Sequence, residues 1–225
     1  MHFYQNRDIC PATNMLLTNP RFSAYMEQLS ARGQVFTRSF QPGALLLRQD
    51  AQALQAFVIQ EGIAKCYMRE NNGKDYIFEF LGKGEITGEL ELIGGQRCIC
   101  SIEAITEVTA WVTPADVFAG LLHTDMEFNR LVMGELATRL TQTCVRASYQ
   151  QAYPLEYGLL RFLMLQQEAQ LFFSSADIAA YLGITVRSFN RTVKQLREKK
   201  VIAVDGLHLD LTRKELDLLL KRFED

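Results

Sequence analysis

The side chains best suited to recognise another molecule lie between residues 187 and 200 of this 225-residue chain. The segment carries six cations and one anion, a net charge of +5, whereas the whole chain has a net charge of −2. The cations are Arg187, Arg191, Lys194, Arg197, Lys199 and Lys200, and the anion is Glu198. A basic segment on an otherwise acidic protein attracts a polyanion, and arginine and asparagine can also pair with guanine and adenine through two hydrogen bonds. The chemistry indicated is recognition of duplex DNA.

The spacing of apolar residues predicts that this segment is one helix with a buried face and a basic face. Four apolar residues recur at steps of three and four and are expected to face the domain core: Val186, Phe189, Val193 and Leu196. The helix start and the opposite face carry the residues that we expect to contact DNA: Thr185, Arg187, Ser188, Asn190, Arg191 and Lys194. Base edges are normally reached from the N-terminal half of such a helix, while lysine supplies phosphate attraction.

A shorter helix and a sharp turn precede the basic helix. Ser174 and Asp177 are three residues apart, a spacing at which both side chains can satisfy free N–H groups at a helix start. The apolar stripe of this helix is Ile178, Ala179 and Leu182. Gly183 permits a left-handed turn, and Thr185 can cap the next helix. Two helices joined in this way form the helix-turn-helix that places a helix in a major groove.

The segment after the basic helix predicts a β-hairpin wing and a closing helix. Residues 201–204 and 207–211 flank the pair Asp205-Gly206, which is typical of tight hairpin turns. His208 is interpreted as a surface residue of the wing. Thr212 then precedes a helix with four residues toward the core: Leu216, Leu219, Leu220 and Phe223.

Two other interpretations of the basic helix are possible. A charged helix can be an ordinary solvated surface, and a basic amphipathic helix can lie on a membrane or in the groove of a partner. Neither requires the preceding helix and glycine turn, and the apolar stripe is narrow, with Phe189 as its one aromatic residue. DNA is therefore the favoured partner.

The first two thirds of the chain read as a helix over residues 20–33 followed by short strands. The expected strands are residues 35–40, 44–49, 54–60, 63–70, 75–81, 97–105 and 107–112. The turn signals between them are Pro42-Gly43, Glu61-Gly62, Asn71-Asn72-Gly73, Gly82-Lys83-Gly84 and Gly94-Gly95. Many short, evenly punctuated strands predict a small antiparallel barrel or roll.

A helix start at Pro114 leads into a long helix from about residue 125 to residue 151, which the pair Tyr153-Pro154 ends. Its mostly apolar face comprises Phe128, Leu131, Val132, Leu136, Leu140, Thr143 and Ala147. We expect this face to pack both on the roll and on the same helix of a second chain. The predicted α+β architecture is a β-roll over residues 1–124, a dimerisation helix over 125–152 and a winged helix-turn-helix domain over 153–225.

Composition narrows the class of protein. The sequence is 48% hydrophobic and 22% charged, as is ordinary for a globular protein. No apolar stretch approaches the roughly 18 residues of a membrane span, and the N-terminus is too polar for a signal peptide, so we expect a cytoplasmic protein. The five cysteines lack the spacing of zinc or iron–sulfur ligands and are expected to be reduced. No phosphate loop, nucleophile elbow or metal triad suggests an enzyme.

The order of roll, long helix and winged helix-turn-helix resembles the cyclic-AMP receptor and fumarate–nitrate regulator (CRP/FNR) family of bacterial transcription factors, and within it the YeiL-like branch. The residues that carry the resemblance are Pro42-Gly43, Gly62, Asn72-Gly73, Gly84, Gly88-Glu89-Leu90 and the segment from Ile178 to Ile202. The resemblance implies a homodimer with two recognition helices about 34 Å apart on a near-palindromic operator, and RNA polymerase as a further partner. Arg191 matches the family's base-contacting arginine. The two preceding contact positions, usually Arg and Glu, hold Val186 and Arg187, so a different operator is expected.

The resemblance also implies positions for an effector. In the family, a Gly-Glu pair holds the ribose of a cyclic nucleotide, an Arg followed by Ser or Thr holds the phosphate, and a Thr-Ser pair on the long helix holds the base. The corresponding residues are Gly88, Glu89, Arg97, Cys98, Thr143 and Cys144. Thiols replace two hydroxyls, and the loop from Glu89 to Arg97 is shorter than in cyclic-AMP binders, which argues against cyclic AMP. Glu89 could equally brace its loop, and Arg97 could pair with Glu91 or Glu103. A lone N-terminal cysteine, Cys10, argues against an iron–sulfur cluster, so no cofactor is assigned.

The cysteines of the roll suggest one further hypothesis. Cys98 and Cys100 alternate along an expected strand and would face the same side, with Cys144 on the long helix as a third candidate. These thiols could sense oxidation. Buried cysteine usually behaves as a small apolar residue, however, and this inert interpretation is favoured.

A second class of function is a signalling adaptor, in which the roll binds a small ligand and the basic helix docks a protein. A DNA reader would instead select a site with dyad symmetry and lose affinity steeply with salt. For the DNA reader, we expect the roll to bias how the long helices pack and thereby to set the separation of the recognition helices. An effector could act only through unequal affinity for the two arrangements.

Overall fold

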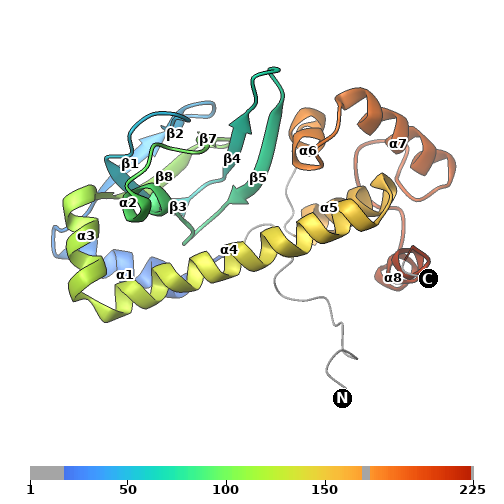
Figure 1. Cartoon of the computed structure of the whole chain (residues 1–225). Coiled ribbons are helices and arrows are strands. Elements are labelled where there is room, and N and C mark those ends of the chain that lie inside the picture. The colour runs from blue at the N-terminus through green and yellow to red at the C-terminus, as the bar shows by residue number, and fades with distance from the viewer. Residues whose placement is uncertain (1–17, 169–172, 224–225) are drawn as a thin grey trace, which may run out of the picture. The chain divides into compact units, whose positions relative to one another are not determined.

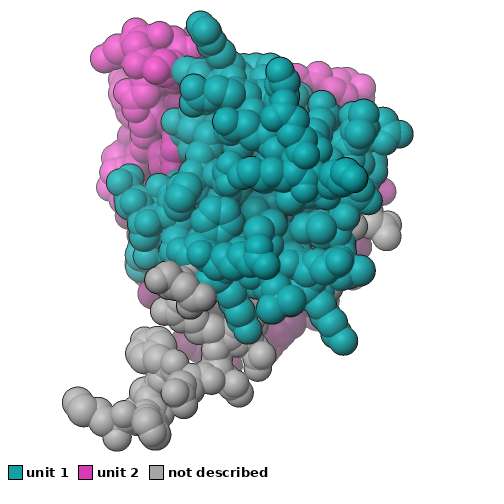
Figure 2. Space-filling view, turned by 90° about the vertical axis from the view of Figure 1, so that its right-hand side faces the viewer, with its two compact units in different colours: residues 1–15, 140–225 teal, residues 16–139 magenta. Residues whose placement is uncertain are grey.

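The computed structural model describes residues 18–168 and 173–223. These residues form two compact units, residues 18–139 and residues 140–223, which Figure 2 distinguishes by colour. The boundary falls inside the long helix, whereas the sequence places domain limits at both ends of that helix. The three-part division stays a prediction.

The N-terminal unit is an antiparallel roll with helices, as the sequence predicts (Figure 1). Its two sheets have the strand orders β1-β8-β3-β6 and β2-β7-β4-β5. The strands are β1 (Phe36–Phe40), β2 (Leu45–Leu47), β3 (Gln55–Glu61), β4 (Ala64–Arg69), β5 (Asp75–Leu81), β6 (Ile86–Thr87), β7 (Ser101–Ala104) and β8 (Val108–Pro114). The helices are α1 (Pro20–Ala31), α2 (Glu89–Gly94), α3 (Ala115–Thr124) and the first half of α4 (Met126–Ala152).

Three local differences separate the roll from its prediction. The two-residue strand β6 and the one-and-a-half-turn helix α2 were not expected, because both are too short to show a period in the sequence. The expected strand over residues 97–105 begins only at Ser101. The reason is that the backbone of Cys98 is already bonded to the loop at Asp50 and Ala51, and residues 99 and 100 form bends. Cys98 and Cys100 therefore do not alternate along a strand.

Apolar packing fixes the first half of α4 in the N-terminal unit. The Phe128 ring is fully buried and meets the rings of Phe22 and Phe118 edge-on, at centroid distances of 6.0 and 5.4 Å. Val132 is buried in the same cluster. The rest of the predicted stripe behaves differently, since Leu140, Thr143 and Ala147 are exposed. Only the first half of the apolar face is thus buried within this chain.

The C-terminal unit consists of the second half of α4 followed by four helices and the wing. The helices are α5 (Leu155–Glu168), α6 (Ser175–Tyr181), α7 (Val186–Glu198) and α8 (Arg213–Lys221). Helix α5 supplies four completely buried residues to the core, Leu159, Leu160, Phe162 and Leu163. The two expected wing strands are reduced to one bridge, between Ile202 and Leu209, because the hairpin is short and closes tightly at Gly206. Thr212 caps α8 with a capping box, as expected.

Replacing Phe128 with alanine should destabilise the N-terminal unit by about 3–5 kcal/mol, because the change leaves a cavity among three aromatic rings. Thermal or urea unfolding would measure this loss. The same substitution at Phe36, whose side chain is 51% exposed, serves as the control and should cost less than about 1 kcal/mol. Equal losses in the two variants would contradict the assignment of Phe128 to the core.

Candidate DNA interface and roll site

Local hydrogen bonds build the helix-turn-helix as the sequence predicts. The Ser174 hydroxyl accepts from the Asp177 N–H at 3.0 Å and donates to the Asp177 carboxylate at 2.6 Å. Gly183 has a φ of +68°, which a side chain would strain, and it leads the chain out of α6. The Thr185 hydroxyl then accepts from the Ser188 N–H at 3.1 Å and starts α7.

Helix α7 presents a basic face to solvent. The core residues Phe189, Val193 and Leu196 are buried as predicted. The exposed residues expected to contact DNA are Thr185, Arg187, Asn190, Arg191 and Lys194, and Ser188 is half-buried. Val186 was expected in the core, but its side chain is 43% exposed. Val186 is the first residue of α7, and the buried residues of the helix begin one turn later at Phe189. Its side chain therefore stays at the surface, as do those of the basic residues.

Three of the six cations of the segment have partners within the C-terminal unit, and one of these is the exposed pair of Lys194 with Glu198 at 4.0 Å. The Arg197 guanidinium donates to the carbonyl oxygens of Ala203 at 3.1 Å and Gly206 at 2.7 Å. Lys199 pairs with Glu156 at 3.1 Å. Arg197 therefore holds the wing beside the end of α7, a role that the sequence count of charges did not reveal.

Comparison with known proteins identifies both units. The sequence model described as the cyclic nucleotide-binding domain matches residues 37–125, and the Crp-like helix-turn-helix domain matches residues 158–222. The chain belongs to the CRP/FNR family of transcription regulators. Among curated relatives, "Regulatory protein YeiL" of Escherichia coli O157:H7 is 27% identical over 143 residues, which cover 63% of this chain and 65% of that protein. "Probable transcriptional regulator flp" of Lacticaseibacillus casei is 24% identical over 79% of this chain and 84% of that protein.

Solved structures show the same CRP/FNR fold. The c-di-GMP responsive global regulator CLP of Xanthomonas campestris superposes with a TM-score of 0.75 at 17% identity, covering 84% of this chain and all of that one. FixK2 of Bradyrhizobium japonicum gives a TM-score of 0.69 at 18% identity, covering 82% of this chain and 96% of that one. At these identities the likeness concerns the fold alone.

In the cyclic nucleotide-binding domain, Gly88 and Glu89 lie at the start of α2. Gly88 has a φ of +87°, and a Cβ there would lie 2.9 Å from the carbonyl oxygen of Gln55, so only glycine fits the backbone. The turn directs the Glu89 side chain into the protein, where it is 1% exposed. A carboxylate this deeply buried requires a partner.

The partner of Glu89 is Arg139, which lies on α4. The guanidinium pairs with the carboxylates of Glu79 at 2.9 Å and of Glu89, and donates to the carbonyl oxygen of Ile86 at 2.6 Å. We call these four residues the Arg139 clamp. The sequence analysis missed it because Arg139 is 50 or more positions from each partner. The bracing role of Glu89 stays a prediction, which this pairing with Arg139 favours.

The electrostatics of the Arg139 clamp reflect an excess of buried acid. Burial raises the pKa of Glu89, and the Arg139 charge opposes that rise. Burial also raises the pKa of neighbouring Glu85, whose carboxylate accepts from the Gly82 N–H at 2.6 Å. Burial opposes the charge on Arg139, but the carboxylates of Glu79 and Glu89 hold its pKa above the ordinary value. The Arg139 clamp therefore contains two carboxylates and one guanidinium.

The other expected effector residues do not gather around Glu89. Arg97 is exposed and donates to the carbonyl oxygen of Asp50 at 2.8 Å, so the alternative in which it pairs with Glu91 or Glu103 is wrong. Glu91 instead accepts from the Ile99 N–H at 3.3 Å, and Glu103 pairs with Lys65 at 3.3 Å. The Cys98 thiol is buried in the apolar interior of the roll, while Thr143 and Cys144 are exposed residues of the C-terminal unit.

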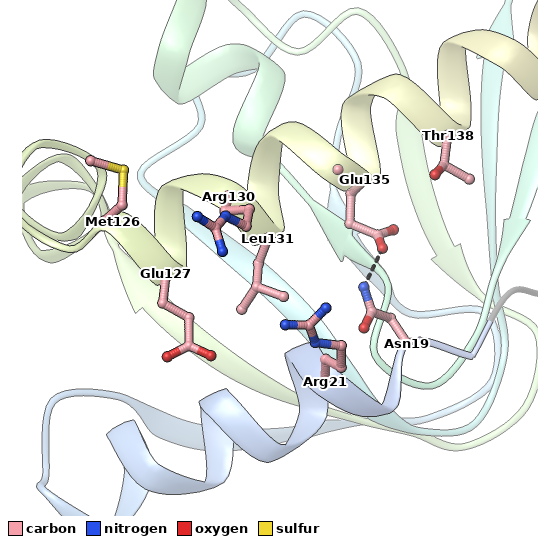
Figure 3. A pocket seen from close by; sticks show the side chains of 9 residues that line it. Asn19, Arg21, Met126, Glu127, Arg130, Leu131, Glu135 and Thr138 are labelled. Carbon is pink, nitrogen blue, oxygen red and sulfur yellow. Dashed lines mark hydrogen bonds between the residues drawn. The ribbon is translucent and has the colours of Figure 1, made fainter.

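A surface cavity of about 660 Å³ lies between the start of α1 and the first half of α4 (Figure 3). Its charged lining residues are Arg21, Arg130, Glu127 and Glu135, so both signs of charge are present. Glu135 is already engaged, because it accepts from the Asn19 amide at 2.5 Å. This mixed lining favours neither an anionic nor a cationic ligand.

Within residues 18–168 and 173–223, no cluster of three or more His, Cys, Asp and Glu side chains could hold a metal ion. No helix in these ranges is both long enough and apolar enough to span a bilayer.

Replacing Arg139 with glutamine should destabilise the protein by about 3–5 kcal/mol at pH 7, because the buried carboxylate of Glu89 and the half-buried carboxylate of Glu79 lose their cation. The pKa of Glu89 should rise further in this variant. An acid whose pKa is raised by folding takes up protons in the folded state as the pH falls. The loss should therefore shrink as the pH is lowered from 7 toward 4.5, which unfolding at several pH values would measure. Arg69→Gln, at the exposed pair with Asp75, is the control and should cost less than about 1 kcal/mol at every pH.

Proposed function

We propose that this CRP/FNR regulator acts as a homodimer that reads a near-palindromic operator through the first half of α7. The observation that carries the proposal is the exposed basic face of α7 on a helix-turn-helix whose opposite face is buried. Arg187 and Arg191 can each form two hydrogen bonds to guanine, and Asn190 can form two to adenine. Val186 offers methyl groups to a thymine methyl. Lys194 supplies attraction to phosphate, and Ser188 and Thr185 add polar contacts at the helix start.

The surface of α4 supports the dimer. Met126, Met133 and Leu140 are exposed apolar residues that recur at intervals of seven, and exposed Ala147 continues the series. A seven-residue repeat of apolar side chains is the pattern by which two helices supercoil. We therefore assign this seam to the α4 helix of a second copy.

The site in the roll supports control by something other than cyclic AMP. Of the groups that would hold a cyclic nucleotide, Glu89 has one carboxylate oxygen on Arg139 and the other buried without a hydrogen-bond partner in the described part of the chain, and Arg97 donates to the carbonyl oxygen of Asp50. A signal that altered the clamp would act on α4 directly, because Arg139 is a residue of that helix. The packing of the two α4 helices would then set the separation of the recognition helices. Because the target is chromosomal DNA, we place the protein in the cytoplasm with RNA polymerase as a further partner.

Replacing Arg191 with alanine should weaken binding to the selected operator by about 10- to 100-fold, because one bidentate base contact is lost. The operator would first be selected from a random duplex library, and affinity would then be measured by gel shift. Arg48→Ala, at an exposed arginine of the roll, has the same change of charge and should leave affinity unchanged.

The salt dependence of binding separates the DNA reader from the signalling adaptor. Affinity for the operator should fall steeply as salt is raised, and Lys194→Ala should reduce the slope by about one. If no duplex were selected from the library, the result would favour the signalling adaptor, in which the basic helix docks a protein.

Replacing Leu140 with glutamate should convert the dimer into monomers, because it places a charge in the apolar seam. Leu54→Glu is the matched control, since Leu54 is 68% exposed and Leu140 is 66% exposed, but Leu54 precedes β3 in the roll. Light scattering after size-exclusion chromatography would report the masses. A dimeric Leu140→Glu variant, or a monomeric wild-type protein, would contradict the assignment of this face of α4 to the dimer interface.

A further inference from the structure

Two thiols meet inside the roll, and one of them was not singled out in the sequence. Cys66 lies in β4, opposite Ile102 of β7 and opposite Glu79 of β5. Cys100 comes one residue before β7, and Ser101 pairs with Tyr67. Continuing this register by one residue brings Cys100 diagonal to Cys66, although Cys100 itself lies in the bend that precedes β7. Both side chains pack in the same apolar cluster, and Cys100 raises the pKa of the Cys66 thiol as a hydrogen-bonding neighbour does.

The two thiols differ in their access to solvent. Cys66 is buried in the apolar cluster between the sheets. Cys100 packs against the same cluster but is partly exposed. A small oxidant can therefore reach Cys100 from outside, whereas Cys66 is reached through Cys100.

We propose that Cys66 and Cys100 are a redox-active pair that forms a reversible disulfide when a hydroperoxide oxidises Cys100. The sulfur of Cys100 attacks one peroxide oxygen, the O–O bond breaks, and water leaves after proton transfer, so that Cys100 becomes a sulfenic acid. The sulfur of Cys66 then attacks the sulfenic sulfur, the S–O bond breaks, and a second water leaves with the thiol proton. Two thiols lose two electrons and two protons, and one hydrogen peroxide becomes two waters.

The surroundings assign the order of these steps. Its hydrogen bond with Cys100, and then burial, raise the pKa of the Cys66 thiol, so Cys66 stays protonated while Cys100 meets the oxidant. Cys66 is then held in place to resolve the sulfenic acid. A disulfide needs the two sulfurs to approach to about 2 Å. The backbone is irregular at both residues, because the β4–β5 register shifts after Cys66 and Cys100 lies in a bend outside β7.

A bond at this place would act on the Arg139 clamp. Cys66 faces Glu79 directly across the β4–β5 pair, and Glu79 holds the Arg139 guanidinium. Drawing Cys66 toward Cys100 would move β4, the strand that pairs with β5, and β5 carries Glu79 of the clamp. Under this proposal, oxidation of the two thiols is a signal that the roll can receive. Formation of the disulfide does not depend on whether the protein binds DNA, so the two proposals can be tested separately.

Cys98 is the competing partner for Cys100, because it is two residues away in the chain. Its thiol is buried, and its backbone N–H and carbonyl are bonded to Ala51 and Asp50. These bonds hold Cys98 in the loop, so it serves as the matched control in the same apolar cluster.

The test is direct identification of the bond in the full chain. The protein is treated with hydrogen peroxide, its remaining thiols are blocked with N-ethylmaleimide, and it is digested with trypsin without reduction. Cys66 then lies in the peptide of residues 66–69, while Cys98 and Cys100 share the peptide of residues 98–130. We expect these two peptides linked, lighter by two hydrogen atoms than their sum, and separated again by dithiothreitol.

Variants assign the bond to Cys100 and give the result that would overturn it. Cys98→Ser should keep the linked peptide, and Cys100→Ser should lose it. Cys66→Ser should lose it and leave Cys100 as a sulfenic acid that dimedone traps. Cys66→Ala, checked for its fold by circular dichroism, should behave as Cys66→Ser does. The proposal fails if wild-type protein keeps residues 66–69 unlinked at peroxide concentrations that oxidise Cys100, or if Cys98→Ser loses the link.

Discussion

The buried ion pair between Arg139 and the carboxylates of Glu79 and Glu89 is the constraint on which the arrangement of the roll depends. A guanidinium in a protein interior is tolerated only when charged and polar partners surround it, and here β5, α2 and the carbonyl of Ile86 supply them. Apolar contacts of Phe128 and Val132 hold α4 two to three turns earlier. Helix α4 is therefore held on the roll by an apolar contact and, further along the helix, by an ionic contact. Of these two contacts, only the ionic one contains groups that can bind a proton or a charged ligand.

The same ionic pair explains why a cyclic nucleotide-binding domain can exist here with an altered site. Glu89 and its supporting Gly88 keep the backbone of the family's binding turn, but the carboxylate is directed to Arg139. Arg97 is tied to the backbone at Asp50, and the thiol of Cys98 faces apolar side chains. One carboxylate oxygen of Glu89 and the guanidinium of Arg97 therefore contact other groups of the protein itself.

Sequence reasoning succeeded where the physical cause is local. The caps at Ser174 and Thr185, the left-handed turn at Gly183 and the buried stripe of α7 depend on residues three or four positions apart, and each is found as expected. It failed where distant segments compete for the same group. A pairing of Arg97 with a nearby glutamate was one of two alternatives, yet a loop 47 residues away offers a carbonyl oxygen instead. Val186 has the right period for the core but lies one turn too early to reach it.

The sequence by itself determined the order of the elements, the two faces of α7 and the family, because hydrophobic period, capping and turn chemistry are written in neighbouring residues. Only the tertiary structure decided which groups became partners. Arg139 meets Glu89, Arg197 meets the wing, and Cys66 meets Cys100 because strands and helices remote in the chain are packed side by side. The physical reason is that burial makes an unpaired charge or polar group costly, so each one takes whichever partner the packed fold brings within reach.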